Sequence, residues 1–216
     1  MNHLFYGEIC NMKKTTDLWK RYGLGGILLN IICKCLKCIG VNVSFWSCDV
    51  QDVNKLQKVS LMPFKELHLS DFEQQSTINS KWFTADKLRD MRQAFLIKDN
   101  HAYGYYEGDI LACYGWISLK QWGLDSALLM NDDSLFWDDY THSDFRGRGL
   151  HKDLNQFRTV KAAEYGKKRV LTIVASYNRA SRVGFERSGF VLFTRFVKFQ
   201  LGKGIERTTL KYERSK

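Results

Sequence analysis

Two arginines and two glycines occupy four successive positions, Arg146-Gly147-Arg148-Gly149, where a predicted strand passes into a predicted helix. The N–H groups of a first helical turn have no intrahelical acceptor, and they carry the positive end of the helix dipole. Glycine lets the backbone approach a ligand closely and adopt positive φ angles. With the charges of the arginines and Lys152, the segment predicts a cradle for a diphosphate group. An ordinary strand-to-helix turn is the alternative, since the spacing matches neither a Walker loop nor a Gly-x-Gly-x-x-Gly motif.

Candidate proton acceptors lie just before this loop. Asp138, Asp139 and His142 stand on or at the end of the preceding strand. Alternation along a strand places Asp138 and His142 on one face and Asp139 on the other. Burial of this stretch predicts a raised pKa for Asp139. Asp139 and His142 are therefore the candidate catalytic residues. The alternative is that the acids are solvated or pair with Arg146 and Arg148, and that His142 only serves the turn.

The elements that must position these residues follow from hydrophobic periodicity and punctuation by caps and glycines. A Ser-x-x-Glu capping box predicts a helix starting at Ser70, and Thr84 is a good N-cap for a helix over 84–95. Further helices are predicted at 148–165 and 178–189, strands at 41–50, 134–142, 169–176, 190–201 and near 208–214, and a hairpin over 102–119 that turns at Glu107-Gly108-Asp109. The helix over 148–165 would bury Leu150, Leu154, Phe157, Val160 and Ala163. The order predicts an α/β or α+β fold around one central sheet.

The segment 16–40 reads as an unusually apolar helix, with a narrow polar stripe at Asn30, Lys34 and Lys37. Its uninterrupted apolar run is about ten residues, whereas a bilayer-spanning helix needs about twenty. The helix therefore packs against its own protein, or it contacts a partner subunit or a membrane surface. We expect residues 1–60 to form an N-terminal extension and residues 61–216 to form the main domain.

The chain has 216 residues and a net charge of +10, which favours an anionic partner or is simply a basic surface. Basic residues are spread along the chain without a nucleic-acid-binding motif, so we expect no nucleic acid partner. Cys35 and Cys38 form one C-x-x-C without a second pair or histidines nearby, so no metal site is expected. The polar N-terminal segment lacks the apolar core of a secretory signal, which predicts a cytoplasmic protein, with peripheral membrane contact left open.

Two motifs about thirty residues apart resemble those of the GNAT superfamily of acyl-CoA-dependent N-acyltransferases. The family loop Arg/Gln-x-x-Gly-x-Gly/Ala matches the segment 146–151, with His151 in place of the last small residue. The family's Asn-led helix ending in Gly-Phe matches the segment from Asn178 to Gly189-Phe190. The resemblance covers about residues 60–200. It implies a mixed central sheet flanked by helices, in which two neighbouring parallel strands splay apart, here the strands ending at His142 and Ser176, with acyl-CoA between them.

The resemblance also implies an activity, the direct transfer of an acyl group from acetyl-CoA or another acyl-CoA to a small-molecule amine, with an amino-sugar as a candidate acceptor. It places backbone groups near 140–142 on the pantetheine arm, N–H groups of 147–152 on the pyrophosphate, and Asn178 near the thiol. The implied cofactor-binding residues are Tyr140, Thr141, His142, Arg146, Gly147, Arg148, Gly149, Leu150, His151, Lys152 and Asn178. Many family members carry a tyrosine acid where this chain has Phe185. A module of the same fold that binds a partner or a membrane without turnover is therefore the alternative, and a homodimer is possible through residues 16–40.

Overall fold

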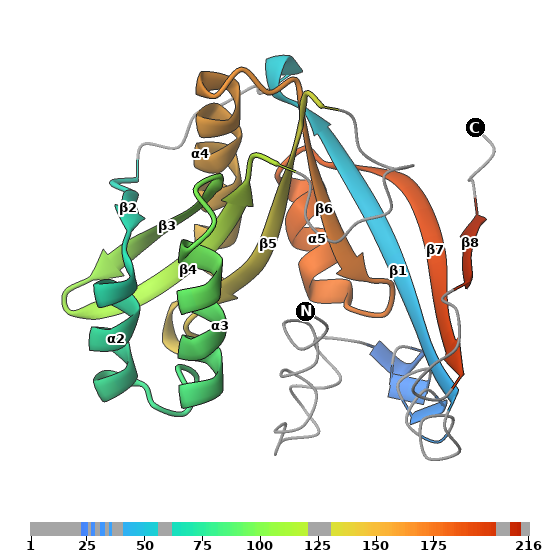
Figure 1. The fold of residues 1–216 in the computed structure, drawn as a ribbon, viewed down its shortest axis with the longest axis horizontal. Helices are drawn as coiled ribbons and strands as arrows, with labels where there is room; N and C mark the ends of the chain where they lie inside the picture. The colour runs from blue at the N-terminus through green and yellow to red at the C-terminus, as the bar shows by residue number, and fades with distance from the viewer. Residues whose placement is uncertain are drawn as a thin grey trace. The chain divides into compact units, whose positions relative to one another are not determined.

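The computed structural model describes residues 41–55, 62–120, 131–201 and 208–212, together with 23–25, 27–28, 31–32 and 35. The chain forms two compact units. Residues 51–172 form the first, called here the central unit, and residues 1–50 and 173–216 form the second, the terminal unit. Figure 1 shows the helices and strands of both.

The central unit is built on a mixed sheet in which β3 (Asn100–Glu107) and β4 (Ile110–Ser118) form the predicted hairpin. Gly108 turns it with a φ of 59°. The short β2 (Lys65–Leu67) pairs antiparallel with β3, and β5 (Asp133–Thr141) pairs antiparallel with β4. The pairing of β5 with β6 (Arg169–Ala175) is parallel and joins residues 133–136 to 169–172. The predicted mixed sheet is thus confirmed.

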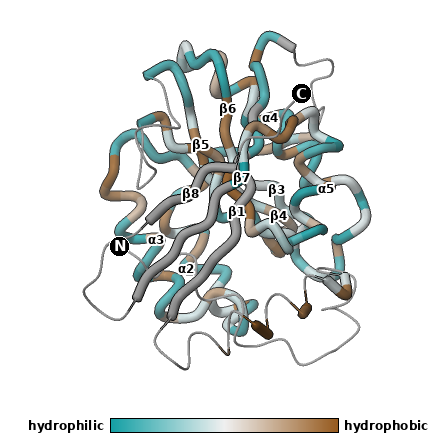
Figure 2. Tube along the Cα trace, turned by 90° about the vertical axis from the view of Figure 1, so that its right-hand side faces the viewer, coloured by the Kyte–Doolittle hydropathy of each residue, from teal (hydrophilic) through white to brown (hydrophobic). Residues whose placement is uncertain are grey.

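Helices cover both faces of this sheet. α2 (Leu69–Ile78) and α3 (Ala85–Phe95) pack together on one face, over a core that includes Phe72, Trp116 and Tyr140. α4 (Leu150–Glu164) packs on the other face, where Phe157 contacts Tyr103. Figure 2 shows hydrophobic stretches of the chain along β5 and β6, in keeping with their burial between helix layers.

Two details of the helices differ from the sequence-based expectation. α2 does not start from a Ser70 capping box, because the N-cap is His68, whose N–H donates to Asp71 Oδ2 at 2.8 Å. Glu73, the other half of the predicted box, instead binds Arg92 of α3 at 2.7 Å. The Thr84 cap of α3 is confirmed, with Oγ1 accepting from the Lys87 N–H.

The buried face of α4 is more polar than predicted. Leu150 and Leu154 are buried as expected, but Phe157 and Val160 are only partly buried and Ala163 is exposed. Their expected places in the core are taken by a set of mostly polar residues, namely Asn155, Gln156, Arg158, Thr159 and Ala162. The prediction of a purely apolar inner stripe was therefore wrong, and the reason is an ion pair described below.

Among the described residues, the terminal unit contains a three-stranded antiparallel ladder, the helix over residues 179–187 and the described helical residues of the segment 23–35. β1 (Val41–Asp52) pairs with β7 (Val191–Leu201), and β7 pairs with β8 (Thr208–Tyr212). α5 (Arg179–Arg187) begins after its predicted cap, Asn178. Of the helix predicted at 16–40, the described residues are helical, and the rest lies outside the described part of the chain. The boundary proposed at residue 60 stays a prediction.

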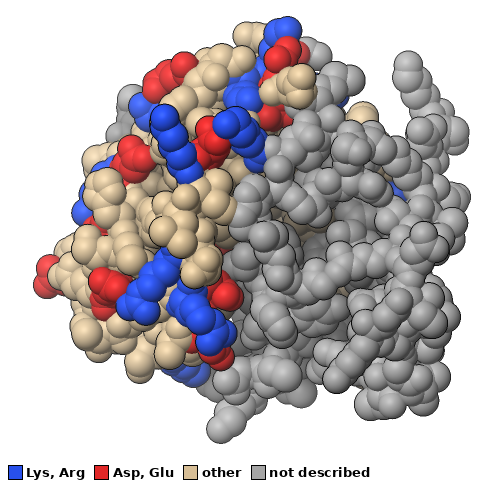
Figure 3. All heavy atoms as spheres, viewed as in Figure 1, with Lys and Arg blue, Asp and Glu red and all other residues tan. Residues whose placement is uncertain are grey.

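The visible face of the central unit carries both signs of charge. Figure 3 shows basic and acidic side chains interspersed over the part of this face that carries α2 and α3. Ion pairs such as Arg92–Glu73 at 2.7 Å and Arg89–Asp86 at 2.9 Å account for this mixture. The described part of this face therefore carries no continuous basic stripe of the kind that follows a nucleic acid backbone.

Candidate functional site

One edge of β5 is open over its second half. The parallel ladder with β6 ends at the pair Phe136–Thr172, whereas β5 runs on to Thr141 and pairs with β4 on its other edge. Residues 137–141 therefore have no strand partner on the β6 side among the described residues. Backbone N–H and C=O groups on such an edge are available to pair with an extended ligand.

The loop that follows β5 has the conformation expected of a diphosphate cradle. After η3 (Ser143–Phe145), Gly147 and Gly149 have φ angles of 82° and 84°, which favour glycine. A Cβ atom at either position would meet nothing within 4 Å, so the loop leaves open space there. Gly149 directly precedes α4, whose first-turn N–H groups are therefore presented at the loop. The geometry of these residues fits an anionic diphosphate group.

The basic side chains of this loop are only partly committed to the protein. Arg146 Nε donates to the Thr141 carbonyl at 3.2 Å, which fixes the loop against the end of β5. The Arg148 guanidinium lies 4.9 Å from the centre of the Phe145 ring. Both arginines and Lys152 are exposed. Their charges are thus available to an anion bound at the start of α4.

Gly115 of β4 faces two residues of β5, because Tyr114 pairs with Tyr140 and Trp116 pairs with Trp137. The extra residue makes a β-bulge, in which Asp138 adopts a φ of 53°. A Cβ atom at residue 115 would overlap the Asp139 carboxylate and the Arg158 guanidinium. Glycine is therefore required at residue 115.

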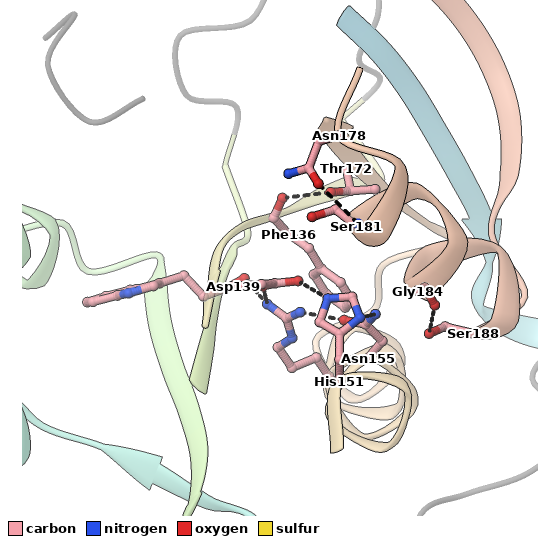
Figure 4. Close-up of polar contacts among 11 residues, drawn as sticks. Phe136, Asp139, His151, Asn155, Thr172, Asn178, Ser181, Gly184 and Ser188 are labelled. Carbon is pink, nitrogen blue, oxygen red and sulfur yellow. Dashed lines mark hydrogen bonds and ion pairs between the residues drawn. The ribbon is translucent and has the colours of Figure 1, made fainter. Parts of the chain in front are cut away.

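Asp139 points toward α4, into a buried polar cluster. Its carboxylate lies 3.0 Å from His151 Nε2 and 2.8 Å from Arg158 Nη1. Arg158 is fully buried, and it also donates to the Trp116 carbonyl at 2.7 Å and to Asn155 Oδ1 at 2.5 Å. Figure 4 shows His151 of α4 pointing at Asp139, with Asn155 of the same helix beside His151. The cluster ties β4, β5 and α4 together.

The predicted rise in the pKa of Asp139 is wrong. Burial by itself would raise the pKa of this carboxyl, but the charges of Arg158 and His151 and the hydrogen bonds that they donate outweigh it. The pKa therefore lies below its ordinary value of 3.8. The alternative interpretation, in which Asp139 pairs with Arg146 or Arg148, is also wrong. The partner of Asp139 is Arg158, which lies on the face of α4 that the sequence predicted to be apolar.

Asp138 points to the opposite face of the sheet. Its carboxylate contacts Lys87 Nζ of α3 and accepts from the Tyr114 hydroxyl at 3.3 Å. The rings of Trp82 and Tyr140 stack beside this group with centroids 4.5 Å apart, and the Lys87 ammonium lies 6.0 Å from the centre of the Trp82 ring. Asp138 therefore lies between an ammonium group and a cluster of aromatic rings. Alternation along β5 had predicted that the two acids would face apart, and the contacts confirm it.

Two further polar groups belong to this aromatic region. Asn79 Nδ2 donates to the Tyr140 hydroxyl at 3.1 Å, and burial raises the pKa of Tyr140 to about 12, which keeps this hydroxyl protonated. Trp82 Nε1 is buried and has no hydrogen-bond partner among the residues that the structure describes. A buried donor without an acceptor costs free energy, so a ligand oxygen placed there would relieve that cost.

The structure brings most of the predicted cofactor-binding residues together. Residues 140–142 and 146–152 form one continuous segment of the central unit. His142 Nδ1 accepts from the Asp144 N–H at 3.3 Å, which is the turn role that the sequence had left as the alternative. Asn178 belongs to the terminal unit, where its Oδ1 accepts from the Ser181 N–H, and Phe185 is buried against Phe190.

Nothing in the sequence indicated that Lys87, Trp82 and Asn79 would lie around Asp138 and Tyr140, and the sequence pattern favoured Asp139 over Asp138 as a catalytic candidate. Lys87 and Asp138 are 51 residues apart, and only the fold joins them. Gly115 was the available signal, because a glycine within an otherwise bulky strand often marks a bulge.

Among the residues that the structure describes, no group of three His, Cys, Asp or Glu side chains is placed to hold a metal ion. No helix in the same residues combines the length and the apolar character needed to cross a membrane.

Several solved structures that are named as GNAT-family or other N-acetyltransferases share this fold. A GNAT-family acetyltransferase from Colwellia psychrerythraea matches 80% of this chain with a TM-score of 0.55 at 17% identity. The aminoglycoside 6'-N-acetyltransferase from Acinetobacter haemolyticus matches 72% with a TM-score of 0.51 at 15% identity. A glucosamine N-acetyltransferase region of a fungal β-N-acetylglucosaminidase matches 78% with a TM-score of 0.56 at 11% identity.

These matches show that the fold is that of the GNAT acetyltransferases. They cover 62% of the Colwellia protein, 99% of the Acinetobacter enzyme and 22% of the fungal chain. No protein-family model and no curated protein sequence matches the chain.

The lowered pKa of Asp139 makes the stability of the fold depend on pH. Because the folded-state pKa lies below the ordinary value of 3.8, the ionised carboxylate stabilises the fold above pH about 4, and this contribution is lost as the pH falls through the folded-state pKa. At pH 7, Asp139→Asn should lower the free energy of unfolding by about 3 kcal/mol, because Arg158 loses its buried partner. In urea unfolding, this loss should shrink below pH 4. The exposed Asp109→Asn variant is the control and should change little at either pH, whereas a loss from Asp139→Asn that is the same at pH 3 and pH 7 would contradict the assignment.

Proposed function

We propose that the chain is an acyl-CoA-dependent N-acyltransferase that moves an acetyl or similar acyl group to the primary amine of a small molecule. The observation that carries the proposal is the open edge of β5, which leads within six residues to the glycine loop at the start of α4. The edge offers backbone groups to an extended pantetheine arm, and the loop offers N–H groups and positive charge to a diphosphate. The shared fold of known acetyltransferases supports the same assignment.

Asp138 is the group best placed to receive the acceptor amine. It lies on the bulge of β5, at the open half of the strand, and it already holds one primary ammonium, that of Lys87. An acceptor ammonium of the same chemistry takes that place beside the carboxylate. Asp139 is held by Arg158 and His151, and its role in the proposal is to position the strand and the loop.

The reaction removes two protons from the acceptor ammonium. Transfer forms a bond between the amine nitrogen and the acyl carbon, and it breaks the bond between that carbon and the sulfur of CoA. The ammonium first loses one proton, which Asp138 accepts, so that the nitrogen lone pair is free to attack. The second proton leaves the nitrogen as the amide forms and passes through water to the departing thiolate, which becomes the thiol of CoA. The thiolate is a good enough leaving group for the reaction to proceed with Phe185 in place of a tyrosine acid.

The walls of the acceptor region favour an amino-sugar. The partly exposed ring of Trp82, which stacks on the buried Tyr140, offers an apolar surface for the face of a sugar ring. Trp82 Nε1, which has no hydrogen-bond partner among the described residues, and the amide of Asn79 are hydrogen-bonding groups for its hydroxyls. Two proteins of similar fold are named as acting on aminoglycosides and on glucosamine, which supports this class.

The apolar residues near the N-terminus support a second, accessory role. Leu24, Leu28, Ile31 and Ile32 expose between 45% and 68% of their surface. Exposing such side chains to water forfeits about 1.5–3 kcal/mol each. We propose that the segment 16–40 contacts a partner subunit or a membrane surface.

The first test of the proposed function is ligand-induced stabilisation. Acetyl-CoA at a hundredfold excess over its Kd should stabilise the protein by about 2.7 kcal/mol, seen as a rise in melting temperature. Gly149→Asp should abolish this rise, because it places negative charge and bulk in the diphosphate cradle. Gly166→Asp is the matched control, since Gly166 has a similar φ of 74° and equally open surroundings at the far end of α4. Equal stabilisation of both variants by acetyl-CoA would refute the cradle.

The second test separates acceptor chemistry from cofactor binding. Asp138→Asn should lower kcat/KM for acetylation of glucosamine or an aminoglycoside about 100-fold, because the proton acceptor is gone. The variant should keep the stabilisation by acetyl-CoA. Asp109→Asn, an exposed carboxylate in the β3–β4 turn, should leave both measurements unchanged. A variant of Asp138 with full activity would eliminate this residue as the proton acceptor.

The third test concerns the N-terminal segment. Removing residues 1–40 stops short of β1, so the truncated protein should stay folded and bind acetyl-CoA. It should lose self-association in light scattering or flotation with anionic liposomes, whichever the full-length protein shows. A full-length protein that is monomeric and ignores liposomes, with a truncated form that aggregates, would assign the segment to the protein's own core.

A further inference from the structure

An open cavity lies on the α4 face of the central unit, away from the acceptor region. Its volume is about 550 Å³. The described residues that line it are four aromatic ones, Phe64, Tyr103, Phe157 and Tyr165, and three charged ones, Glu66, Lys161 and Glu164. Lys161 is twelve residues beyond Gly149, which at 1.5 Å per helical residue places it about 18 Å from the glycine loop. Asp138 faces the other side of the sheet, so the cavity is separate from both proposed binding regions.

The aromatic rings form a wall that suits a cation. Phe157 packs against Phe64 with ring centroids 5.3 Å apart and against Tyr103 at 5.4 Å in a T-shaped arrangement. Tyr165 stacks on His101 at 4.9 Å, which holds its ring at the rim. The face of an aromatic ring carries negative electrostatic potential and attracts ammonium groups.

The charges of the cavity add to this preference. Glu66 and Glu164 are two carboxylates against the single ammonium of Lys161, in a chain whose overall charge is +10. Both carboxylates are about half exposed, so each keeps an oxygen accessible. Glu66 also accepts from His101 Nδ1 at 2.8 Å, which orients it. The cavity is therefore a locally acidic site on a basic protein.

The ammonium group of Lys161 shows where a cation can lie in this cavity. Lys161 Nζ lies 2.7 Å from Glu164 Oε2 and 5.6 Å from the centre of the Phe157 ring. One ammonium thus already meets a carboxylate and an aromatic face together. Lys161 reaches this place on a flexible chain that is partly exposed, so an incoming ammonium can displace it.

We propose that this cavity binds a small organic cation, a primary alkylamine or diamine, whose ammonium replaces that of Lys161 between Glu164 and Phe157. The aliphatic chain of the ligand lies along Tyr103 and Tyr165, and a second ammonium reaches Glu66. The Tyr103 hydroxyl remains a donor there, because burial, its hydrogen bond to Tyr165 and the charge of Glu66 raise its pKa. The site is independent of acyl transfer and stands whether or not the chain is an acyltransferase.

The test titrates 1,5-diaminopentane into the full-length protein at about 0.15 M ionic strength and measures binding by isothermal titration calorimetry. Glutarate, a dianion of the same chain length, is the ligand control and should not bind. Glu164→Gln should raise the Kd of the diamine about tenfold, because the charge-assisted hydrogen bond is lost. Lys161→Met should lower it several-fold, because the internal competitor is removed. The two substitutions lie on one turn of α4, yet they should change the Kd of the diamine in opposite directions.

Matched controls separate the site from bulk charge. Lys167→Met and Glu73→Gln remove the same charges outside the cavity and should leave the Kd within about twofold, as expected for screened surface charges. Tyr165→Leu keeps an apolar rim but loses the ring, and it should weaken binding about fivefold. Circular dichroism and melting temperature confirm that each variant is folded. The proposal is overturned if no binding is seen up to about 20 mM diamine, if glutarate binds equally, or if Lys161→Met and Lys167→Met have the same effect.

Discussion

The buried ion pair between Asp139 and Arg158 is the interaction on which the arrangement of the central unit depends. Placing two charges away from water is costly, and it is tolerated only when geometry and further hydrogen bonds satisfy them. Here the guanidinium binds the carboxylate of β5, the Trp116 carbonyl of β4 and Asn155 of its own helix. One side chain therefore fixes α4 against two strands. Since α4 begins at the glycine loop, the pair also fixes where that loop stands relative to the open edge of β5.

The same pair explains why two adjacent acids have different surroundings. With Asp139 turned toward α4, the neighbouring Asp138 faces the side covered by α2 and α3. Gly115 makes this possible, because a side chain there would occupy the space of the ion pair. The positive φ of Asp138 is a local strain, and such strain persists only where the surrounding structure determines it. The carboxylate that faces the aromatic region thus owes its position to contacts on the opposite side of the sheet.

Much of the fold was predictable from the sequence because its signals are local. Alternation, caps and turn glycines predicted the β3–β4 hairpin, the start of α3 at Thr84 and the positive φ of the loop glycines. The start of α2 was not predicted, because the helix is capped by His68 and Asp71 and not by the predicted pair of Ser70 and Glu73. The burial of Arg158 was not predicted. Its ionic partner, Asp139, lies 19 positions earlier in the sequence, and only the fold brings the two side chains together in the core.

In the candidate site, too, the contiguous part was predictable from the sequence and the part assembled by tertiary contacts was not. The loop of residues 146–152 is contiguous and was found from its composition, whereas the group around Asp138 is assembled from α3, β4 and β5 and was not. The expected rise in the pKa of Asp139 failed for a related reason. Burial was inferred correctly, but the sign of a pKa shift is decided by the partner, and the partner is a tertiary contact.

The order of the strands along the chain has a consequence for how the protein is made. β1 and β7 pair within the terminal unit, yet their paired residues Val50 and Val191 are separated by about 140 residues that include nearly the whole central unit. Closing so long a loop is slow and entropically unfavourable until the intervening chain has become compact. On the ribosome, the central unit is complete before β7 has been synthesised, so the edge of β1 that pairs with β7 has no partner until then. Synthesis thus leaves an exposed strand edge in the nascent protein, and the last strands to emerge are the ones that cover it.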